Sequence, residues 1–324
     1  MQTQLTSLYG PVSEDLILVE DLLESTKQVG LSPLKRMLDH ALEARGKRLR
    51  PALVLLAGTF GDYNLNKLVP LGAAIELLHT ASLVHDDVVD GAESRRARPT
   101  TNAIFDNAVT VLLGDYMFAN AAEMVTRTGS LTVTRLFALA LMKMTSGELE
   151  QDAAAFDVGR DIQAYLSRIG GKTAALFANA TEGGAELAGC PPATVDALRT
   201  YGYSMGMAFQ IVDDILDYTG DEATMGKPVG GDLREGTVTL PGLLHLERFP
   251  VDNPIKKFFT ARRGREERLK EAIEAIRSAG VLELAMDMAR EYVRRANEAI
   301  AILPDTEAHR CLVEIGDYVM ARQS

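Results

Sequence analysis

The segments HTASLVHDDVVD (residues 79–90) and FQIVDDILD (residues 209–217) each end in three aspartates with the spacing Asp-Asp-x-x-Asp. Residues i and i+4 share one face of a helix, so the first and last aspartates of each pentad project together. Like charges at this spacing destabilise a bare helix, and we therefore expect a bound cation to compensate them. Oxygen-only ligand sets favour hard divalent ions such as Mg²⁺, which also accepts water and substrate phosphates as ligands.

Apolar residues surround both pentads, which argues against the alternative that each is only a solvated acidic turn. They are Leu77, Leu78, Leu83 and Val84 at the first pentad, and Phe209, Ile211, Val212, Ile215 and Leu216 at the second. Carboxylates within such segments cost free energy unless they are paired or bind a metal. Two such pentads far apart in the sequence predict two facing helices that hold one polyphosphate through shared Mg²⁺ ions.

Composition and charge limit the class of protein. The chain has 324 residues, 47% of them hydrophobic and 24% charged, with a formal net charge of −11. This acidic balance argues against non-specific binding of nucleic acid. Cys190 and Cys311 lack metal-ligand spacing, which favours a reduced cytoplasmic compartment. No signal-peptide pattern occurs in Met1 to Asp15 and no apolar run of membrane-spanning length is found, so we expect a soluble protein with no transmembrane segment.

Helical periodicity dominates the sequence. Ser32-Pro33 is typical of an N-cap followed by the first helical position, and further helices are expected from about Pro70 to Gly91 and from Pro191 to about Tyr218. No stretch alternates with period two over the length of a strand. The sequence therefore predicts an all-α protein.

The expected organisation is one domain over residues 1–324, with an N-terminal helical region at 1–30. The polar, glycine-rich segment 219–236 is the longest expected loop, and its place after the second pentad favours a lid. A charged stretch, 261–267, is expected to form a turn between C-terminal helices.

Several basic residues are candidates for binding phosphate. GKRLRP (46–51) places Lys47 and Arg50 in a turn before an apolar helix, where an arginine fork and a compact lysine charge suit a phosphate. His79 lies two helical turns before Asp86 on the same face. A single histidine there is more often a packed core residue, and its neighbours favour the ligand interpretation. Further candidates are Arg95, Arg96, Lys172, Thr173 and Lys227.

Seven motifs occur in a defined order: GKRLRP (46–51), HTASLVHDDVVD (79–90), RR (95–96), GELEQ (147–151), KT (172–173), FQIVDDILD (209–217) and GKPVGGD (226–232). With them the chain resembles the trans-polyprenyl diphosphate synthases, which elongate isoprenoid chains head to tail. The resemblance extends from Gly46 to the C-terminal helix near Arg322. It implies an all-α, isoprenoid-synthase-type helical bundle around a central cavity, with the two aspartate-rich helices facing each other.

The resemblance also implies roles for individual residues. Asp86 and Asp90 would bind two Mg²⁺ ions and Asp213 a third, with Asp87, Asp214 and Asp217 in support, and these six aspartates together with Lys172 and Lys227 would be the catalytic residues. Contacts to the allylic diphosphate would come from Arg95, Lys172, Thr173, Gln210 and Lys227. Lys47, Arg50, His79 and Arg96 would hold the diphosphate of isopentenyl diphosphate without a metal ion.

The implied activity is that of a prenyltransferase acting by ionisation, condensation and elimination. Its substrates would be isopentenyl diphosphate and an allylic diphosphate (dimethylallyl, geranyl, farnesyl or geranylgeranyl), and the released diphosphate would take up the proton. A homodimer is expected, with helices of the 101–155 region in the interface. One departure is that Thr237 stands where many family members carry a lysine, which removes one cation near the allylic diphosphate.

Product length is predicted from the residues below the first pentad. One helical turn rises about 5.4 Å, close to the length of an isoprene unit. Short-chain relatives carry an aromatic side chain four or five residues before the first aspartate, whereas this chain has the small residues Ser82 and Ala81. We expect a product of C30 to C50, and the alternative is a C15 to C20 farnesyl or geranylgeranyl diphosphate synthase. The candidates for the floor of the product tunnel are Phe118, Met124, Phe137 and Met142.

Two other functions compete with this one. A class I terpene cyclase shares the fold, but it normally replaces the second pentad with an Asn/Asp-Ser/Thr-Glu metal motif and needs no Lys47/Arg50/His79 pocket. A regulatory subunit of a heteromeric synthase usually loses aspartates from the pentads, and this chain keeps all six.

Overall fold

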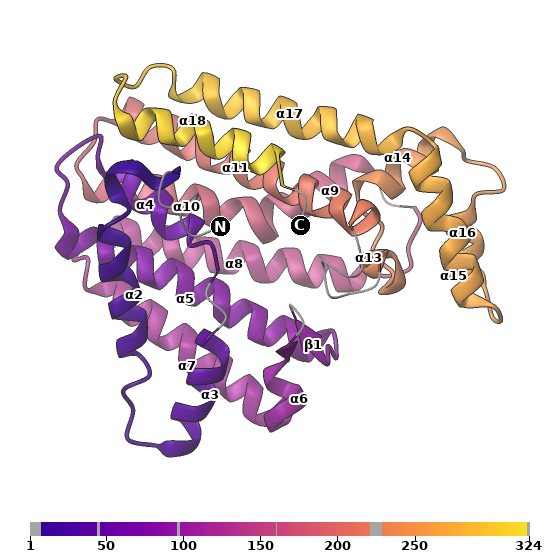
Figure 1. Cartoon of the computed structure of the whole chain (residues 1–324), viewed down its shortest axis with the longest axis horizontal. Coiled ribbons are helices and arrows are strands. Elements are labelled where there is room, and N and C mark those ends of the chain that lie inside the picture. Colours follow the sequence, from indigo (N-terminus) through magenta and orange to yellow (C-terminus); the bar gives the residue numbers. More distant parts are fainter. Residues whose placement is uncertain (1–7, 44–45, 96–97, 160, 221–228, 323–324) are drawn as a thin grey trace. The chain divides into compact units, whose positions relative to one another are not determined.

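In a computed structural model of the chain, residues 8–43, 46–95, 98–159, 161–220 and 229–322 are described. Their elements are η1 Gly10–Val12, α2 Asp15–Ser25, α3 Ser32–Glu43, α4 Leu49–Gly58, α5 Leu65–Val89, β1 Ser94–Arg95, β2 Arg98–Pro99, α6 Thr101–Phe105, α7 Asn107–Thr126, α8 Leu131–Ala153, α9 Ile162–Ile169, η2 Gly170–Ala174, α10 Ala175–Leu187, α11 Pro192–Thr219, α13 Gly231–Arg234, α14 Leu240–Arg248, α15 Pro254–Thr260, α16 Arg265–Ser278, α17 Val281–Ile300 and α18 Glu307–Met320. The predicted all-α class is confirmed (Figure 1).

The residue contacts divide the chain into two compact units. Unit 1 comprises Met1–Met142, Leu176–Tyr203 and Asn297–Ile315, and unit 2 comprises Lys143–Ala175, Ser204–Ala296 and Gly316–Ser324. The first pentad and the GKRLRP turn belong to unit 1. The second pentad and Lys172 belong to unit 2.

The core of unit 1 is built around α5, which packs against α2, α4 and α7. Figure 1 shows α5 and α7 side by side. Its first turn is capped by Asn64, whose side-chain oxygen accepts the N–H of Asn66. Gly91 follows the helix with φ +60°, a left-handed conformation that glycine adopts at low cost and that ends helices.

Helix α5 departs from expectation in two respects. It begins at Leu65 rather than near Pro70, because the Asn64 cap starts it a full turn earlier and Pro70 lies inside it. It also contains an 18-residue window with mean hydropathy 1.3, so by length and composition it is apolar enough to span a membrane, contrary to our expectation that no such stretch exists. Of that window 67% is buried inside the protein, as in the core helix of a globular fold.

In unit 2, the C-terminal part of helix α8, from Lys143 on, and the π-helical segment η2 approach closely at two glycines. A Cβ at Gly147 would lie 2.9 Å from the backbone N of Lys172, and a Cβ at Gly171 would lie 3.0 Å from the carbonyl oxygen of Lys143. A π-helical turn inside a helix is often found at a functional site. Here it carries the Lys172-Thr173 pair.

Two predicted helix starts and the predicted break between C-terminal helices are confirmed. Helices begin at Ser32 and Pro192, and residues 261–264 separate α15 from α16. The hairpin formed by Ser94–Arg95 and Arg98–Pro99 was not predicted, because two-residue strands are too short to show alternation. Of the expected loop 219–236, residues 221–228 lie outside the described residues, and a short helix, α13, occupies its end.

Candidate active site

The first pentad lies at the C-terminal end of helix α5, and its aspartates differ in environment. Asp86 is half-buried and Asp90 is exposed, whereas Asp87 is 5% exposed. The Nε of Arg95 donates to Oδ1 of Asp87 at 2.7 Å, forming an ion pair. The side-chain nitrogen of Asn102 also donates to the backbone carbonyl of Asp87 at 3.3 Å. Asp87 is thus held by protein groups and ties the β1–β2 hairpin to the end of α5.

His85 fixes the contact between α5 and α7 beside this pentad. Its Nε2 lies 3.0 Å from the carbonyl oxygen of Val111, and its ring meets that of Phe118 edge to face at 5.1 Å. A Cβ at Gly114 would lie 2.1 Å from Nε2, so only glycine leaves room for the imidazole. Phe118, a candidate for the tunnel floor, therefore lies level with the pentad.

In the second pentad, in unit 2, the first two aspartates show the same division. Asp213 is exposed and Asp214 is 3% exposed. Asp214 accepts hydrogen bonds from the hydroxyl of Tyr165 (2.6 Å) and from Nε2 of Gln210 (2.8 Å). Burial raises the pKa of Asp214 to about 7, although both hydrogen bonds oppose the shift. Burial and the Asp214 charge likewise raise the pKa of Tyr165 well above its ordinary value.

Asp217, the last aspartate of the second pentad, anchors the glycine-rich loop. Its two carboxylate oxygens accept the backbone N–H groups of Gly231 (3.1 Å) and Asp232 (3.2 Å), at the start of α13. The N–H of Gly230 also donates to the Asp217 carbonyl at 2.8 Å. Asp217 is 4% exposed, so this buried carboxylate holds the start of α13 in place.

The carboxylate of Asp213 faces an arginine near the C-terminal end of the chain. Nη2 of Arg322 donates to Oδ1 of Asp213 at 3.1 Å. The guanidinium also stacks on Phe209, with Cζ 4.2 Å from the ring centroid. The Arg322 side chain is 12% exposed and that of Asp213 is 53% exposed. A cation therefore already neutralises the most accessible carboxylate of this pentad.

Lys172 and Thr173 are held by two neighbouring helices. Nζ of Lys172 pairs with Oε2 of Glu148 at 2.5 Å and donates to Oε1 of Gln151 at 3.4 Å, both on α8. The hydroxyl of Thr173 donates to Oε1 of Gln210 at 2.6 Å. Since Gln210 also donates to Asp214, a continuous hydrogen-bond chain links Thr173 to the buried carboxylate.

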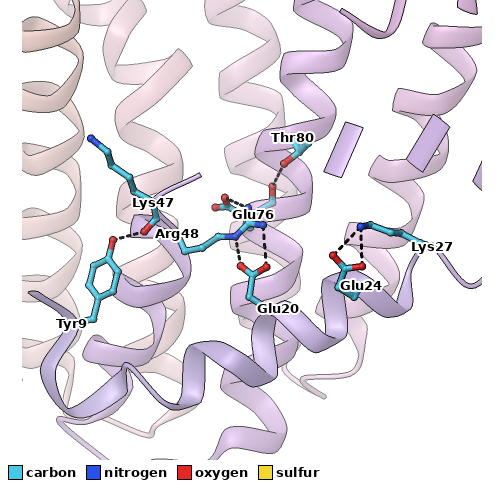
Figure 2. A network of polar contacts seen from close by, with 8 residues as sticks. All are labelled: Tyr9, Glu20, Glu24, Lys27, Lys47, Arg48, Glu76 and Thr80. Atoms are coloured by element: carbon cyan, nitrogen blue, oxygen red, sulfur yellow. Dashed lines mark hydrogen bonds and ion pairs between the residues drawn. The ribbon is translucent and has the colours of Figure 1, made fainter. Parts of the chain in front are cut away.

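In the GKRLRP turn of unit 1, the cationic side chains point in different directions. Arg48 turns inward to Glu20 and Glu76, and Figure 2 shows the Lys47 ammonium pointing away from both glutamates. The Lys47 carbonyl accepts a hydrogen bond from the Tyr9 hydroxyl. Arg50 is half-buried, with Cζ 4.7 Å from the centroid of Phe177.

His79 is half-buried on α5, and its carbonyl oxygen accepts the hydroxyl of Ser82 at 2.8 Å. Unit 1 thus carries Asp86, Asp90, Arg95 and three further candidates for binding diphosphate, Lys47, Arg50 and His79. Arg96 and Lys227, also predicted to bind diphosphate, lie outside the described residues.

The carboxylates suit a metal ion that takes most of its ligands from water and substrate phosphates. Within the described part of the chain, no group of three or more His, Cys, Asp or Glu side chains lies close enough to hold a metal ion. Mg²⁺ usually needs only one or two protein carboxylates, with water and substrate phosphates completing its shell. Asp86, Asp90 and Asp213 suit this role because they are partly or fully open to solvent, and Asp213 already attracts a cation.

Sequence reasoning missed three residues at these positions. Tyr165 lies 49 residues before Asp214, and only its hydroxyl within an otherwise apolar helix face could have marked it. Arg322 lies 109 residues after Asp213. Arg48 was visible within GKRLRP, but its role depends on Glu20 and Glu76, each 28 residues away.

The family model of the polyprenyl synthetases matches residues 32–276 of this chain. The chain is 38% identical over 315 residues to "Heptaprenyl diphosphate synthase component 2" of Bacillus subtilis (strain 168), covering 97% of this chain and 90% of that protein. It is also 38% identical over 279 residues to octaprenyl diphosphate synthase of Escherichia coli (strain K12), covering 86% of each.

Among solved structures, the fold matches a polyprenyl synthase from Caulobacter crescentus CB15 complexed with calcium and isoprenyl diphosphate. The TM-score is 0.93 at 35% sequence identity, covering 99% of this chain and 98% of that one. These matches confirm the predicted family and the isoprenoid-synthase fold.

Proposed function

We propose that this chain, which belongs to the polyprenyl synthetase family of prenyltransferases, adds isopentenyl diphosphate head to tail to an allylic diphosphate. The reaction would use Mg²⁺, and the product would be an all-trans polyprenyl diphosphate of C30 to C50. The observation that carries the proposal is the division of aspartates in both pentads. The central aspartates, Asp87 and Asp214, are buried and accept protein hydrogen bonds, whereas the leading ones, Asp86 and Asp213, reach solvent.

In this proposal Asp86, Asp90 and Asp213 hold the metal, and three Mg²⁺ ions are expected with substrate bound. The calcium and isoprenyl diphosphate named with the Caulobacter structure support a divalent ion for this family. When bound, Mg²⁺ would supply electrostatic stabilisation of the departing diphosphate. Asp87 and Asp214 would support the helix segments that carry the leading aspartates, because each is fixed by its own hydrogen bonds.

The allylic diphosphate would be contacted by Lys172, Thr173, Arg95, Gln210 and Lys227. Lys172 is 30% exposed and pairs with Glu148, so a diphosphate would have to draw the ammonium from that carboxylate. The Nε of Arg95 is engaged by Asp87, and its guanidinium offers four further N–H donors. Fixed cations of this kind stabilise the charge that develops on the leaving group.

Lys47, Arg50, His79 and Arg96 would bind the diphosphate of isopentenyl diphosphate. The outward direction of Lys47 in Figure 2 supports this, since its neighbour Arg48 is turned the other way. This pocket separates an elongating synthase from a terpene cyclase, which binds no second diphosphate.

We further propose that the growing chain runs along α5 past Ala81 and Ser82. Both residues have small side chains, so neither places an aromatic ring across that path. Ala81 is fully buried and Ser82 is half-buried. Among the floor candidates, Met124 and Phe137 are buried, whereas Met142 is 65% exposed and Phe118 lies beside His85. Met124 and Phe137 are therefore the favoured floor residues.

A cytoplasmic homodimer with one domain per chain is part of the proposal. Exposed apolar side chains on α7 and α8 support the predicted interface. Val109, Val111 and Leu139 are each close to 40% exposed and Leu112 is 66% exposed.

A second candidate is that the chain is one subunit of a heteromeric synthase. The name of the Bacillus relative, "component 2", favours it. The test is elongation by the purified chain alone, given Mg²⁺, labelled isopentenyl diphosphate and farnesyl diphosphate. Turnover without a second protein supports the homomeric enzyme. Turnover that appears only when a lysate fraction is added assigns the chain to a heteromer.

The carboxylate assignment has its own test. Replacing Asp86 with Ala should reduce turnover by about a hundredfold or more, since a main contributor to charge stabilisation is lost. Asp62→Ala, at an exposed carboxylate before α5, is the matched control and should retain wild-type turnover. Near-normal turnover of Asp86→Ala would refute the proposed metal site.

A further inference from the structure

Arg48, the middle cation of the GKRLRP turn, pairs with two carboxylates. Its Nε and Nη2 bind the two carboxylate oxygens of Glu20 on α2, the latter at 3.2 Å, and its Nη1 binds Oε1 of Glu76 on α5 at 2.8 Å. The three side chains are 13%, 21% and 7% exposed. A guanidinium suits this task because its planar fork can meet two carboxylates at once.

The backbone at Arg48 is also unusual. It is the N-cap of α4 and has φ 53° and ψ 32°, the left-handed region that costs a non-glycine residue energy. Such a conformation persists only where surrounding contacts impose it. Here the contacts to Glu20 and Glu76 are the ones that fix the side chain.

The consequence appears in the direction of the neighbouring residue. In Figure 2, Lys47 and Arg48 extend to opposite sides of the turn. The Tyr9 hydroxyl holds the Lys47 carbonyl, so the turn is fixed through its backbone as well as through Arg48.

Burial disfavours the charge on Arg48, yet the hydrogen bonds and charges of Glu20 and Glu76 outweigh it and hold the pKa of Arg48 above its ordinary value.

Glu76 links this turn to the predicted histidine. It lies three residues before His79 on α5, nearly one helical turn away, and its carbonyl accepts the Thr80 hydroxyl at 2.9 Å. A single arginine therefore ties the turn that carries Lys47 and Arg50 to the helix that carries His79.

We propose that Arg48, clamped by Glu20 and Glu76, is a positioning residue that sets the spacing of Lys47, Arg50 and His79 for one diphosphate. Arg48 itself would not touch the ligand. The inference rests on the proposed function, because it takes that diphosphate to belong to isopentenyl diphosphate. It predicts a defect confined to one of the two substrates.

The central variant is Arg48→Lys, which keeps the charge but loses the planar fork that binds Glu20 through two nitrogens and Glu76 through the third. Glu76→Gln is the second variant, since it weakens only the tie to α5 and leaves the Glu20 contact. The matched control is Arg290→Lys, because Arg290 also bridges two carboxylates, Glu283 and Asp287, but on the exposed surface of α17.

Each protein is assayed for the KM of isopentenyl diphosphate, the KM of farnesyl diphosphate, kcat and Tm. Isopentenyl diphosphate binding is also measured by calorimetry without metal. Arg48→Lys and Glu76→Gln should raise the KM for isopentenyl diphosphate and weaken its binding by about tenfold, as expected when binding groups are misplaced. The KM for farnesyl diphosphate should change less than about twofold, and Arg290→Lys should match wild type.

The outcomes separate the possible roles. A lowered Tm with wild-type KM values would make Arg48 merely structural and overturn the inference, and so would equal increases in both KM values. If Arg48→Lys does not fold, a wild-type KM for isopentenyl diphosphate in Glu76→Gln overturns it. A wild-type chain that neither binds nor elongates isopentenyl diphosphate overturns the proposed function and this inference with it.

Discussion

The hydroxyl of Tyr165 donates a 2.6 Å hydrogen bond to Oδ2 of Asp214, and both side chains are buried. The hydroxyl thereby fixes the central carboxylate of the second pentad beside Asp213. Burial dominates the protonation of Asp214 and raises its pKa from 3.8 to about 7. This relationship has a consequence for stability that can be measured without substrate.

Stability should fall as pH rises through the titration of Asp214. The folded protein retains a proton on Asp214 up to about pH 7, whereas the unfolded chain releases it near pH 3.8. The stabilisation is therefore fully present below pH 3.8 and is lost as pH rises through about 7. In urea unfolding with EDTA between these pH limits, the free energy of unfolding should fall less steeply with pH for Asp214→Asn than for wild type.

The control for this experiment is Asp305→Asn, at an exposed carboxylate that pairs with Arg310. The pH dependence of its free energy of unfolding should match that of wild type. Equal slopes for wild type and Asp214→Asn would mean that Asp214 does not bind the additional proton in the folded state.

Asp217 and Asp213 should separate structural support from catalysis. Asp217→Ala removes the acceptor for the N–H groups of Gly231 and Asp232, so hydrogen exchange over residues 229–236 should accelerate. Asp213→Ala should abolish turnover while leaving exchange in that segment unchanged. Unchanged exchange in Asp217→Ala would contradict its role as the loop anchor.

Arg322 should compete with the metal for Asp213. The guanidinium occupies the Asp213 carboxylate at 3.1 Å, and a divalent ion at the same oxygen would have to displace it. Arg322→Gln should therefore lower the Mg²⁺ concentration needed for half-maximal binding, measured by calorimetry with inorganic pyrophosphate present. A higher requirement in Arg322→Gln would instead show that the arginine assists metal binding.

A bulky residue at position 81 should shorten the product. Ala81→Phe introduces a ring about one helical turn below Asp86, across the path proposed for the growing chain. Because Ala81 is fully buried, the ring should also cost about 1–3 kcal/mol of folding stability, so Tm is measured in parallel. Ala81→Ser is the control, and an unchanged product spectrum in a folded Ala81→Phe protein would refute this path.

The sequence allowed the fold class to be predicted because helical periodicity and proline positions are local signals. The helices from Ser32 and Pro192 were predicted on this basis. The predicted start of α5 near Pro70 is late, because the Asn64 cap begins the helix at Leu65 and Pro70 lies inside it. The β1–β2 hairpin gave no periodic signal, and its tie to Asp87 through Arg95 depends on tertiary contact.

The candidate site was less fully predictable for the same reason. The pentads and basic motifs are visible in the sequence, but the difference between Asp213 and Asp214 depends on Tyr165 and Arg322, both distant in the chain. The close approach of Gly147 to Lys172 likewise appears only once α8 and η2 are packed together. Sequence patterns indicate which residue types are present, and burial determines which of them remain available to a ligand.

The most direct test is chromatography of dephosphorylated products from the purified chain, given Mg²⁺, labelled isopentenyl diphosphate and farnesyl or geranylgeranyl diphosphate. The account predicts a ladder of products ending between C30 and C50. A product that stops at C20 from farnesyl diphosphate would preserve the chemistry and contradict the proposed path past Ala81 and Ser82. No elongation from any allylic primer, by a folded chain, would contradict the central claim that this protein alone is a polyprenyl diphosphate synthase.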